Sequence, residues 1–165
     1  MKKLFLYSLI LLLFSACSFE TPPNEWQFKS IDAFDSYQKN FLSSNDLLAK
    51  NDLNRAIKHA KSSDDLTTLA RIYLGECALN KSVGVSDKCD NYEKISSLIK
   101  DEALNSYFLF INLKGSSESL KSVPKQYQNI SYYLKENDYK SANDMLKEIK
   151  EPASMFLCGA LWVNI

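Results

Sequence analysis

Apolar residues recur at helical spacing along most of this chain of 165 residues, with polar residues between them. In the stretch 66–79, the apolar positions predicted to share one helix face are Leu66, Leu69, Ala70, Tyr73 and Cys77. Only four glycines and few runs of β-branched residues are present, which argues against a β-rich domain. The pattern predicts an all-α fold of about eight short antiparallel helices joined by short polar turns.

Three segments of the chain resemble one another, because each begins with two Asn or Asp residues and ends with a lysine. They are Asn51–Lys61, Asp90–Lys100 and Asn137–Lys147, and their starts are 39 and 47 residues apart. Short Asn and Asp side chains accept hydrogen bonds from the free amides of a first helical turn, so each segment is predicted to begin a helix. Asp90 and Glu93 have the spacing of a capping box.

A second, more apolar helix is predicted after each of these segments. These helices are expected at Leu66–Leu79, Glu102–Leu113 and Ala153–Val163, the last with Pro152 in its first turn. Two further helices are expected at Ile31–Ala49, with a break near Ser43 and Ser44, and at Pro124–Glu136.

The paired helices resemble tetratricopeptide-type repeats over about residues 45–150. The stretch 48–56 carries the nearest match, since that family's second helix often has an aromatic residue or leucine followed by alanine three positions later. Leu53 with Ala56, and Tyr139 with Ala142, have this spacing. The resemblance implies an array of helical hairpins. The spacing is uneven and differs from the family's period of about 34 residues, so an irregular helical bundle is the alternative.

The amino-terminal apolar run, Leu4 to Phe14, is too short to cross a bilayer, which takes about 20 residues. Lys2 and Lys3 precede the run, and small residues follow it. A charged start, a short apolar stretch and a small-residue exit are typical of an export signal that is removed.

The segment Leu13–Cys17 resembles the lipobox of bacterial lipoproteins, with Ser15 and Ala16 at the small-residue positions. The resemblance implies a thioether-linked diacylglycerol on Cys17, cleavage just before this residue, and acylation of the new amino terminus. Two or more acyl chains anchor a protein stably. An ordinary secretory signal, or an uncleaved anchor, is the alternative.

The expected organisation is a signal peptide at 1–16, a lipidated tether at 17–25 that contains Pro22 and Pro23, and a single helical domain at 26–165. Ser18 stands where an aspartate tends to retain lipoproteins in the inner membrane of well-studied Gram-negative bacteria. The resemblance therefore implies a lipid-anchored protein of the bacterial cell envelope, held in the outer membrane and facing the periplasm.

The charges are balanced, with 20 Lys and Arg residues against 20 Asp and Glu residues. No basic patch stands out in the sequence, so nucleic acid is not expected as a partner. Hydrophobic residues make up 45% of the chain, which is enough for a packed core.

Cys77 and Cys89 are the best candidates for a disulfide, because they flank the turn-like stretch Asn80–Lys88 and an exported chain meets an oxidising environment. The alternative is that Cys77 and Cys158 are free cysteines buried in apolar helices. No metal or cofactor is expected, since the cysteines lack the close spacing of zinc sites and His59 is the single histidine.

Catalytic motifs are few. No serine or cysteine motif accompanies His59, so a surface or helix-end histidine is the favoured interpretation. Glu118-Ser119 resembles the acid motif of lytic transglycosylases, which cut peptidoglycan, and this resemblance implies Glu118 as a general acid. The glycine-rich and aromatic motifs of that family do not follow it.

The carboxyl end carries no charge after Glu151 and is rich in large apolar residues. Such a helix packs inside the domain or is covered by a partner. Internal packing is the favoured interpretation, with Trp162 as a core residue.

These observations favour a membrane-anchored lipoprotein that acts as a non-catalytic interaction or structural protein of the cell envelope. Its expected partners are the membrane, through the lipid anchor, and other envelope proteins. One alternative is an envelope assembly or secretion accessory factor, and another is a peptidoglycan-cleaving enzyme that uses Glu118.

Overall fold

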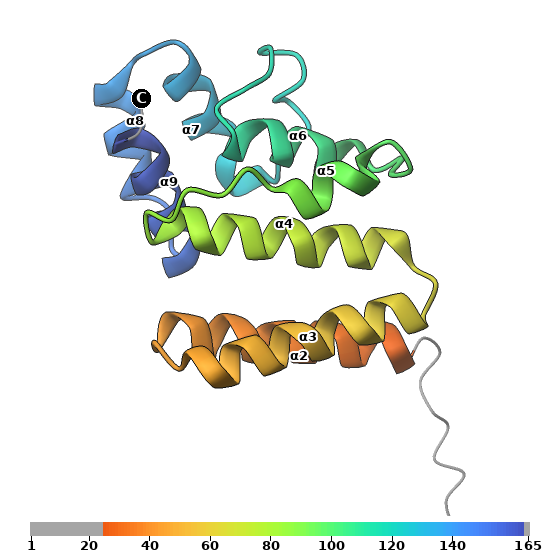
Figure 1. The fold of residues 1–165 in the computed structure, drawn as a ribbon. Helices are drawn as coiled ribbons and strands as arrows, with labels where there is room; N and C mark the ends of the chain where they lie inside the picture. Colours follow the sequence, from red (N-terminus) through yellow and green to blue (C-terminus); the bar gives the residue numbers. More distant parts are fainter. Residues whose placement is uncertain (1–24, 164–165) are drawn as a thin grey trace, which may run out of the picture.

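The structure, a computed structural model, describes residues 25–163, and the predicted signal peptide and Cys17 lie outside this range. Within it the chain forms eight helices and no strand, so the predicted all-α fold is confirmed (Figure 1). The helices are α2 (Glu25–Leu42), α3 (Asp46–Ser62), α4 (Leu66–Ser82), α5 (Asp90–Ser96), α6 (Glu102–Ile111), α7 (Lys125–Lys135), α8 (Tyr139–Leu146) and α9 (Pro152–Val163).

Most helix starts lie close to the predicted ones, and the expected break near Ser43 and Ser44 is confirmed. α2 ends at Leu42 and α3 begins at Asp46, with Ser44 in the left-handed region at φ 58°. α2 begins at Glu25, well before the predicted start at Ile31 and one residue inside the predicted tether.

Of the three helix starts predicted at paired Asn and Asp residues, those at Asp90 and Asn137 are confirmed, since α5 begins at Asp90 and α8 begins at Tyr139. Asp138 caps α8, since its carboxylate accepts a hydrogen bond from the amide of Ser141 at 3.1 Å. Asn51 instead lies inside α3, because the apolar stripe of that helix already begins at Ala49. The predicted capping box at Asp90 is wrong, since the N-cap of α5 is Cys89 and no side chain caps this helix.

α4 is the central helix of the molecule, and it contacts α2, α3, α5, α6 and α9. Leu69 and Ile72 pack with the α2–α3 hairpin, whereas Ala70 and Leu74 belong to the larger core built from α5 to α9. Of the apolar positions predicted to share one face of this helix, Leu69, Ala70 and Cys77 are buried. Both sides of α4 are covered, and the predicted face residue Leu66 is exposed.

The packing of α9 decides between the two predicted architectures. In a stacked array each repeat contacts its neighbours along the chain. α9 instead returns to α4 and packs against it, past the intervening helices (Figure 1). The described helices therefore form an irregular bundle around α4.

Small side chains bring the first helices close together. The hairpin of α2 and α3 is lined by Ala33, Ala49, Ala56 and Ala60. The buried hydroxyl of Ser30 donates to the carbonyl oxygen of Ala56 at 2.8 Å, which joins the two helices directly.

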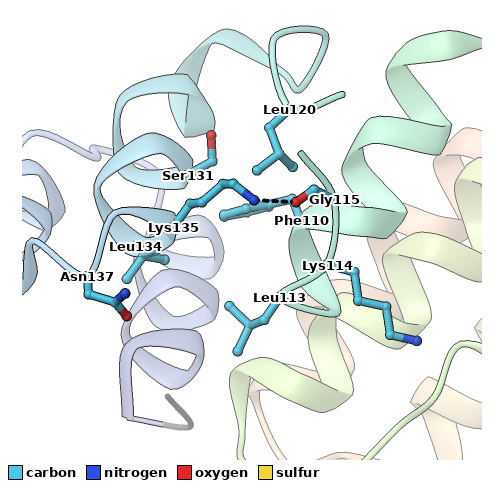
Figure 2. A pocket seen from close by; sticks show the side chains of 9 residues that line it. All are labelled: Phe110, Leu113, Lys114, Gly115, Leu120, Ser131, Leu134, Lys135 and Asn137. Atoms are coloured by element: carbon cyan, nitrogen blue, oxygen red, sulfur yellow. Dashed lines mark hydrogen bonds between the residues drawn. The ribbon is translucent and has the colours of Figure 1, made fainter. Parts of the chain in front are cut away.

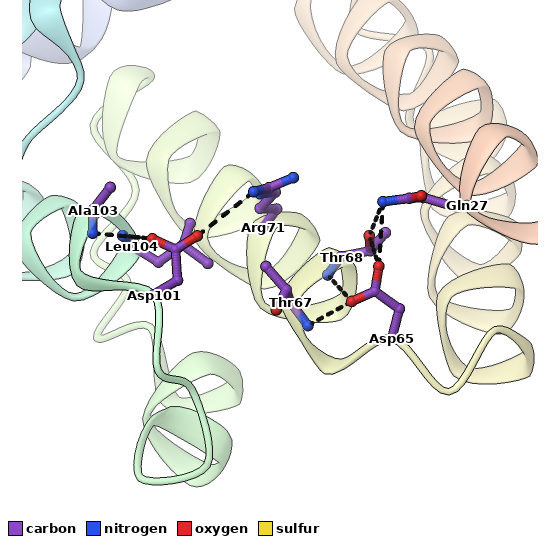
Figure 3. Close-up of polar contacts among 8 residues, drawn as sticks. All are labelled: Gln27, Asp65, Thr67, Thr68, Arg71, Asp101, Ala103 and Leu104. Atoms are coloured by element: carbon purple, nitrogen blue, oxygen red, sulfur yellow. Dashed lines mark hydrogen bonds and ion pairs between the residues drawn. The ribbon is translucent and has the colours of Figure 1, made fainter. Parts of the chain in front are cut away.

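Two capping aspartates also link neighbouring helices (Figure 3). Asp65 accepts hydrogen bonds from the amides of Thr67 and Thr68, at 3.0 and 3.1 Å, at the start of α4. Gln27 of α2 donates to the other carboxylate oxygen of Asp65 at 3.3 Å. The cap therefore satisfies free amides of one helix and holds a second helix beside it.

Asp101 has the same double role at the start of α6 (Figure 3). It accepts from the amides of Ala103 and Leu104, at 3.0 and 3.2 Å. Its other carboxylate oxygen lies 3.6 Å from the guanidinium of Arg71 on α4.

Candidate interaction surface

α9 is apolar on both of its faces, and only one face is covered. The covered face packs into the larger core and consists of Ser154, Leu157, Cys158 and Leu161. The opposite face holds the exposed residues Pro152, Met155, Phe156, Trp162 and Val163. We call this second set of residues the α9 outer face.

The α9 outer face is a continuous apolar strip, because its members recur at three- and four-residue spacing along one side of the helix. Phe156 is 53% exposed and Val163 is 76% exposed. Gly159 lies between them, and a Cβ atom placed on Gly159 would meet no other atom within 4 Å. No residue of the helix carries a charge.

The expectation that Trp162 is a core residue is wrong, since its side chain is 38% exposed. The physical reason is that α9 needs only one face for its contacts with α4 and α8. Leu157 and Leu161 supply that face, so the large side chains on the other side remain at the surface.

The orientation of α9 is fixed by polar contacts at its first turn. The hydroxyl groups of Tyr127 on α7 and Ser154 on α9 lie 2.6 Å apart in the buried core. The carboxylate of Glu151 accepts from the amide of Ala153 at 3.0 Å and caps the helix. α9 therefore presents its outer face from a defined position.

The free cysteine of α9 faces inward. Cys158 is fully buried, and burial raises the pKa of its thiol to about 12. A thiol that stays protonated is a poor nucleophile, so Cys158 acts as a small core residue.

The structure places the sulfur atoms of Cys77 and Cys89 1.97 Å apart, which is a disulfide, with a Cα–Cα distance of 5.2 Å. The carboxylate of Asp87 orders the intervening loop, because it accepts from the amide of Cys89 and from the side chain of Asn80, both at 2.7 Å. The loop is therefore tied back to the end of α4.

Cys77, Asp87 and Cys89 form a cluster with the spacing of metal ligands, and no other such cluster is found within residues 25–163. Atoms of Cys77, Asp87 and Cys89 lie within 4.8 Å of one another. Metal binding by cysteine requires the thiolate form. Since both sulfurs are in the disulfide, Asp87 alone offers an anionic ligand.

A pocket of about 390 Å³ lies between α6, α7 and the loop that joins them (Figure 2). Phe110, Leu120 and Leu134 form its apolar wall, and Lys114 and Lys135 stand at its rim. The ammonium group of Lys135 donates to the carbonyl oxygen of Gly115 at 2.6 Å. No carboxylate or thiol lines this pocket, so the side chains present can bind a small molecule but offer no acid–base pair.

The predicted catalytic candidate Glu118 lies on the surface of the α6–α7 loop. Its side chain is 80% exposed and forms an ion pair with Lys121 at 2.5 Å. A general acid for glycosidic cleavage works in an apolar, enclosed environment. The structure does not place Glu118 in such an environment.

His59 lies in the last turn of α3, and its ring centroid is 5.5 Å from that of Trp26. Burial lowers the pKa of its imidazole, and the nearby charges of Lys29, Arg55 and Lys58 lower it further. Its Nδ1 atom is buried and makes no hydrogen bond within the described residues. The ring packs against an aromatic side chain.

Comparisons of the chain with protein families, with curated proteins and with solved structures found no match. No helix in the range 25–163 is both long and apolar enough to cross a bilayer. The α9 outer face corresponds to the less favoured of the two sequence interpretations, a helix covered by a partner, since the tryptophan was expected in the core. The absence of charge after Glu151 was the signal that pointed to it.

Proposed function

We propose that this protein is a lipid-anchored, non-catalytic protein of the bacterial cell envelope that binds another envelope protein through the α9 outer face. The single observation that carries this proposal is the exposed, uncharged apolar strip on α9. Contiguous apolar surface of this kind is uncommon on a protein without a partner.

The composition of the strip supports protein binding. Phe156 and Trp162 are large, rigid aromatic side chains, and such residues supply much of the free energy of protein–protein binding. Gly159 leaves room between them for a side chain of the partner. A fixed helix with projecting aromatic anchors fits a groove on a second protein.

The position of the strip supports a partner away from the membrane surface. α2 begins at one end of the α2–α3 hairpin, and α9 lies near the opposite end (Figure 1). Ala153, in the first turn of α9, packs with Tyr37 and Ala49 toward that opposite end. A lipid on Cys17, eight positions before Glu25, would anchor the chain at the first end and leave α9 free.

The anchor itself contributes to this function. A protein that is confined to a membrane surface meets other components of that surface at a raised effective concentration. A weak contact through one helix is then sufficient for a populated complex.

The proposal is tested by site-specific photo-crosslinking in the bacterium that makes the protein. A benzoylphenylalanine at Phe156 is expected to capture a defined envelope protein. The same probe at Tyr132, an exposed aromatic residue of α7, serves as the matched control and is expected not to capture it. Equal capture from both positions, or none from Phe156, contradicts the proposal.

A second variant separates binding from folding. Gly159→Leu adds a bulky side chain where the free protein has open space and replaces a helical glycine, so its thermal unfolding is expected at or above the temperature of the parent. The crosslink from Phe156 is expected to disappear, because the added side chain fills the space at the centre of the strip. A crosslink that survives this change places the contact elsewhere.

A further inference from the structure

The loop that joins α6 to α7, residues 112–124, forms one wall of the pocket between these helices. Leu120 fixes the loop in the larger core. The hydroxyl of Ser119 accepts a hydrogen bond from the amide of Ser116 at 2.8 Å and closes a turn. Gly115 has φ 103°, and a Cβ atom there would lie 2.8 Å from the hydroxyl oxygen of Ser119, so this turn requires glycine. The loop side of the pocket is therefore a fixed wall.

The pocket is apolar inside and basic at its rim. Phe110, Leu120 and Leu134 form the inner wall and are almost fully buried. The exposed side chains of Lys114, from the loop, and Lys135, from α7, stand at the rim (Figure 2). The volume of about 390 Å³ is within the range of small-molecule sites.

Lys135 is held in place at the pocket without losing its charge. Its ammonium group reaches from α7 to the loop and donates to the carbonyl oxygen of Gly115 at 2.6 Å (Figure 2). An ammonium group has three donors, so two remain for a ligand. Lys135 forms no ion pair among the described residues, and the carbonyl group that holds it is neutral.

No acidic side chain compensates the charges at the rim. None of the residues that line the pocket is an aspartate or a glutamate. Glu136 and Asp138 follow Lys135 closely in the chain, but neither lines the pocket, and Asp138 is engaged in the cap of α8. Lys114 also lacks an ion pair within the part of the chain that the structure describes. Two uncompensated positive charges beside an apolar wall favour a ligand that is apolar and anionic.

A second hollow of about 380 Å³ adjoins this pocket, since Leu120, Ser131 and Lys135 line both. No acidic residue lines the second hollow either. The other lysine in its lining, Lys121, is already ion-paired with an acid of the same loop. Lys135 therefore supplies the free positive charge at the junction of the two hollows.

We propose that the pocket between α6 and α7 binds small amphiphilic anions, which combine an apolar body with one carboxylate group. The apolar body lies against Phe110, Leu120 and Leu134. The carboxylate accepts hydrogen bonds from the ammonium groups of Lys114 and Lys135. This site is separate from the α9 outer face and does not depend on the lipid anchor, so it goes beyond the proposed function.

Fluorine NMR tests the ligand class, with para-trifluoromethylbenzoate titrated into the full-length protein in micelles of a non-ionic detergent. The neutral para-trifluoromethylbenzamide has the same shape and is the matched ligand, and micelles without protein are the blank for both. The carboxylate is expected to bind about tenfold more tightly than the amide, because only the carboxylate forms charge-assisted hydrogen bonds with the lysines. Equal affinities of the two ligands, or no binding of the carboxylate, would overturn the proposal.

Charge variants test the two lysines. Lys114→Gln with Lys135→Gln is expected to lower the affinity for the carboxylate to that for the amide, and to leave the affinity for the amide unchanged. The matched control, Lys50→Gln with Lys140→Gln, removes two exposed lysines that line neither hollow and is expected to change neither affinity. Carboxylate binding that survives the first pair, or that falls equally with the second, contradicts recognition by this rim.

A single added charge tests the location. Leu113 lines the pocket and is 41% exposed, so Leu113→Glu is expected to leave the fold intact and to place a negative charge beside the bound carboxylate. The affinity for the carboxylate is expected to fall about tenfold, while that for the amide changes little. Leu98→Glu, at an exposed leucine outside both hollows, is the control and is expected to bind as the parent does. Unchanged carboxylate binding in Leu113→Glu would place the ligand elsewhere and overturn the proposal.

Discussion

The hydroxyl oxygen of Tyr127 lies 2.6 Å from that of Ser154, and this buried contact joins α7 to α9 across 27 positions of sequence. Tyr127 also shares a hydrogen bond with Tyr107, and the side chain of Ser154 also bonds to Glu151, so the contact belongs to a small polar network. Removing the hydroxyl of Tyr127 therefore takes a partner from both Ser154 and Tyr107, and the loss of a partner for a buried polar group is costly.

Tyr127→Phe is therefore expected to lower the free energy of unfolding by about 1–3 kcal/mol. Ser154→Ala is expected to cost less, because Tyr127 also bonds to Tyr107 and keeps that partner. The double variant is expected to cost less than the sum of the two single variants, because each single variant already removes the bond between Tyr127 and Ser154. Urea denaturation of the four proteins measures this coupling, and strictly additive losses would show that the two hydroxyls do not interact.

Replacement of two helical glycines by alanine is expected to change the stability of the protein in opposite directions. A Cβ atom on Gly75 of α4 would lie 2.3 Å from the ring of Phe34 on α2, so the ring must move if Gly75 becomes alanine. Overpacking of this kind costs about 1–3 kcal/mol, which outweighs the gain in helix propensity of about 1 kcal/mol. Gly75→Ala is expected to lower the melting temperature, and Phe34→Leu in the same chain is expected to restore part of the loss.

Gly159→Ala is the matched control, because open space surrounds that position on α9. It is expected to raise the free energy of unfolding by about 0.5–1 kcal/mol through helix propensity alone. Equal effects of the two alanines would contradict the close packing of α2 on α4.

The sequence predicted helices well because helix existence depends on local periodicity and on caps. α7 and α9 begin within one residue of the predicted positions. The pattern could not say which side of a helix is buried when both sides are apolar. Leu157 and Phe156 are neighbours of similar hydrophobicity, yet the first is buried and the second is exposed. That difference depends on the tertiary return of α9 to α4, which no local pattern records.

The start of α2 shows a different limitation of the sequence pattern. The paired prolines at 22 and 23 favoured an extended tether, and the helix was predicted to start only at Ile31. α2 begins at Glu25, so Trp26 and Phe28 belong to a helix instead. The contact of Trp26 with His59 of α3 follows from the hairpin turn near Ser44, and the spacing of residues in the sequence does not reveal it.

Asp65 gives a prediction that depends on pH. Its carboxylate accepts the Thr68 hydroxyl at 2.6 Å and two amides of α4, and these bonds, the hydroxyl bond most of all, lower the pKa of Asp65. A carboxyl group with a lowered pKa in the folded state stabilises the fold above its unfolded pKa, near 4, and loses this contribution as the pH falls through its folded pKa.

Asp65→Ala is therefore expected to cost about 1 kcal/mol at pH 7 and less in acid. Asp65→Asn keeps a hydrogen-bond acceptor for the helix cap, so it is expected to retain most of the stability. Because asparagine cannot titrate, the pH dependence of stability that comes from Asp65 is expected to disappear. Chemical denaturation between pH 3 and pH 7 compares the three proteins. A loss in Asp65→Ala that does not change with pH would contradict the role of the ionised cap.

The disulfide between Cys77 and Cys89 is expected to contribute on the order of 3 kcal/mol, because it closes a short loop in the unfolded chain. Mass spectrometry of unreduced protein is expected to find the peptides of Cys77 and Cys89 joined. Cys158 is expected to resist thiol reagents until the protein unfolds, since it is buried. Free thiols at both Cys77 and Cys89 in protein isolated without a reducing agent would contradict the bond.

The proposed lipid anchor on Cys17 has the most direct test, because its chemistry requires one sulfur atom. A diacylglycerol thioether cannot form on a serine hydroxyl, so Cys17→Ser is expected to abolish the incorporation of labelled fatty acid. Cleavage of such signals follows lipidation, and the variant is therefore expected to accumulate as a precursor that retains residues 1–16. Cys158→Ser is the matched control, since it removes a thiol that is buried in the folded domain, and its labelling is expected to equal that of the parent. Equal labelling of Cys17→Ser and the parent would place the lipid elsewhere.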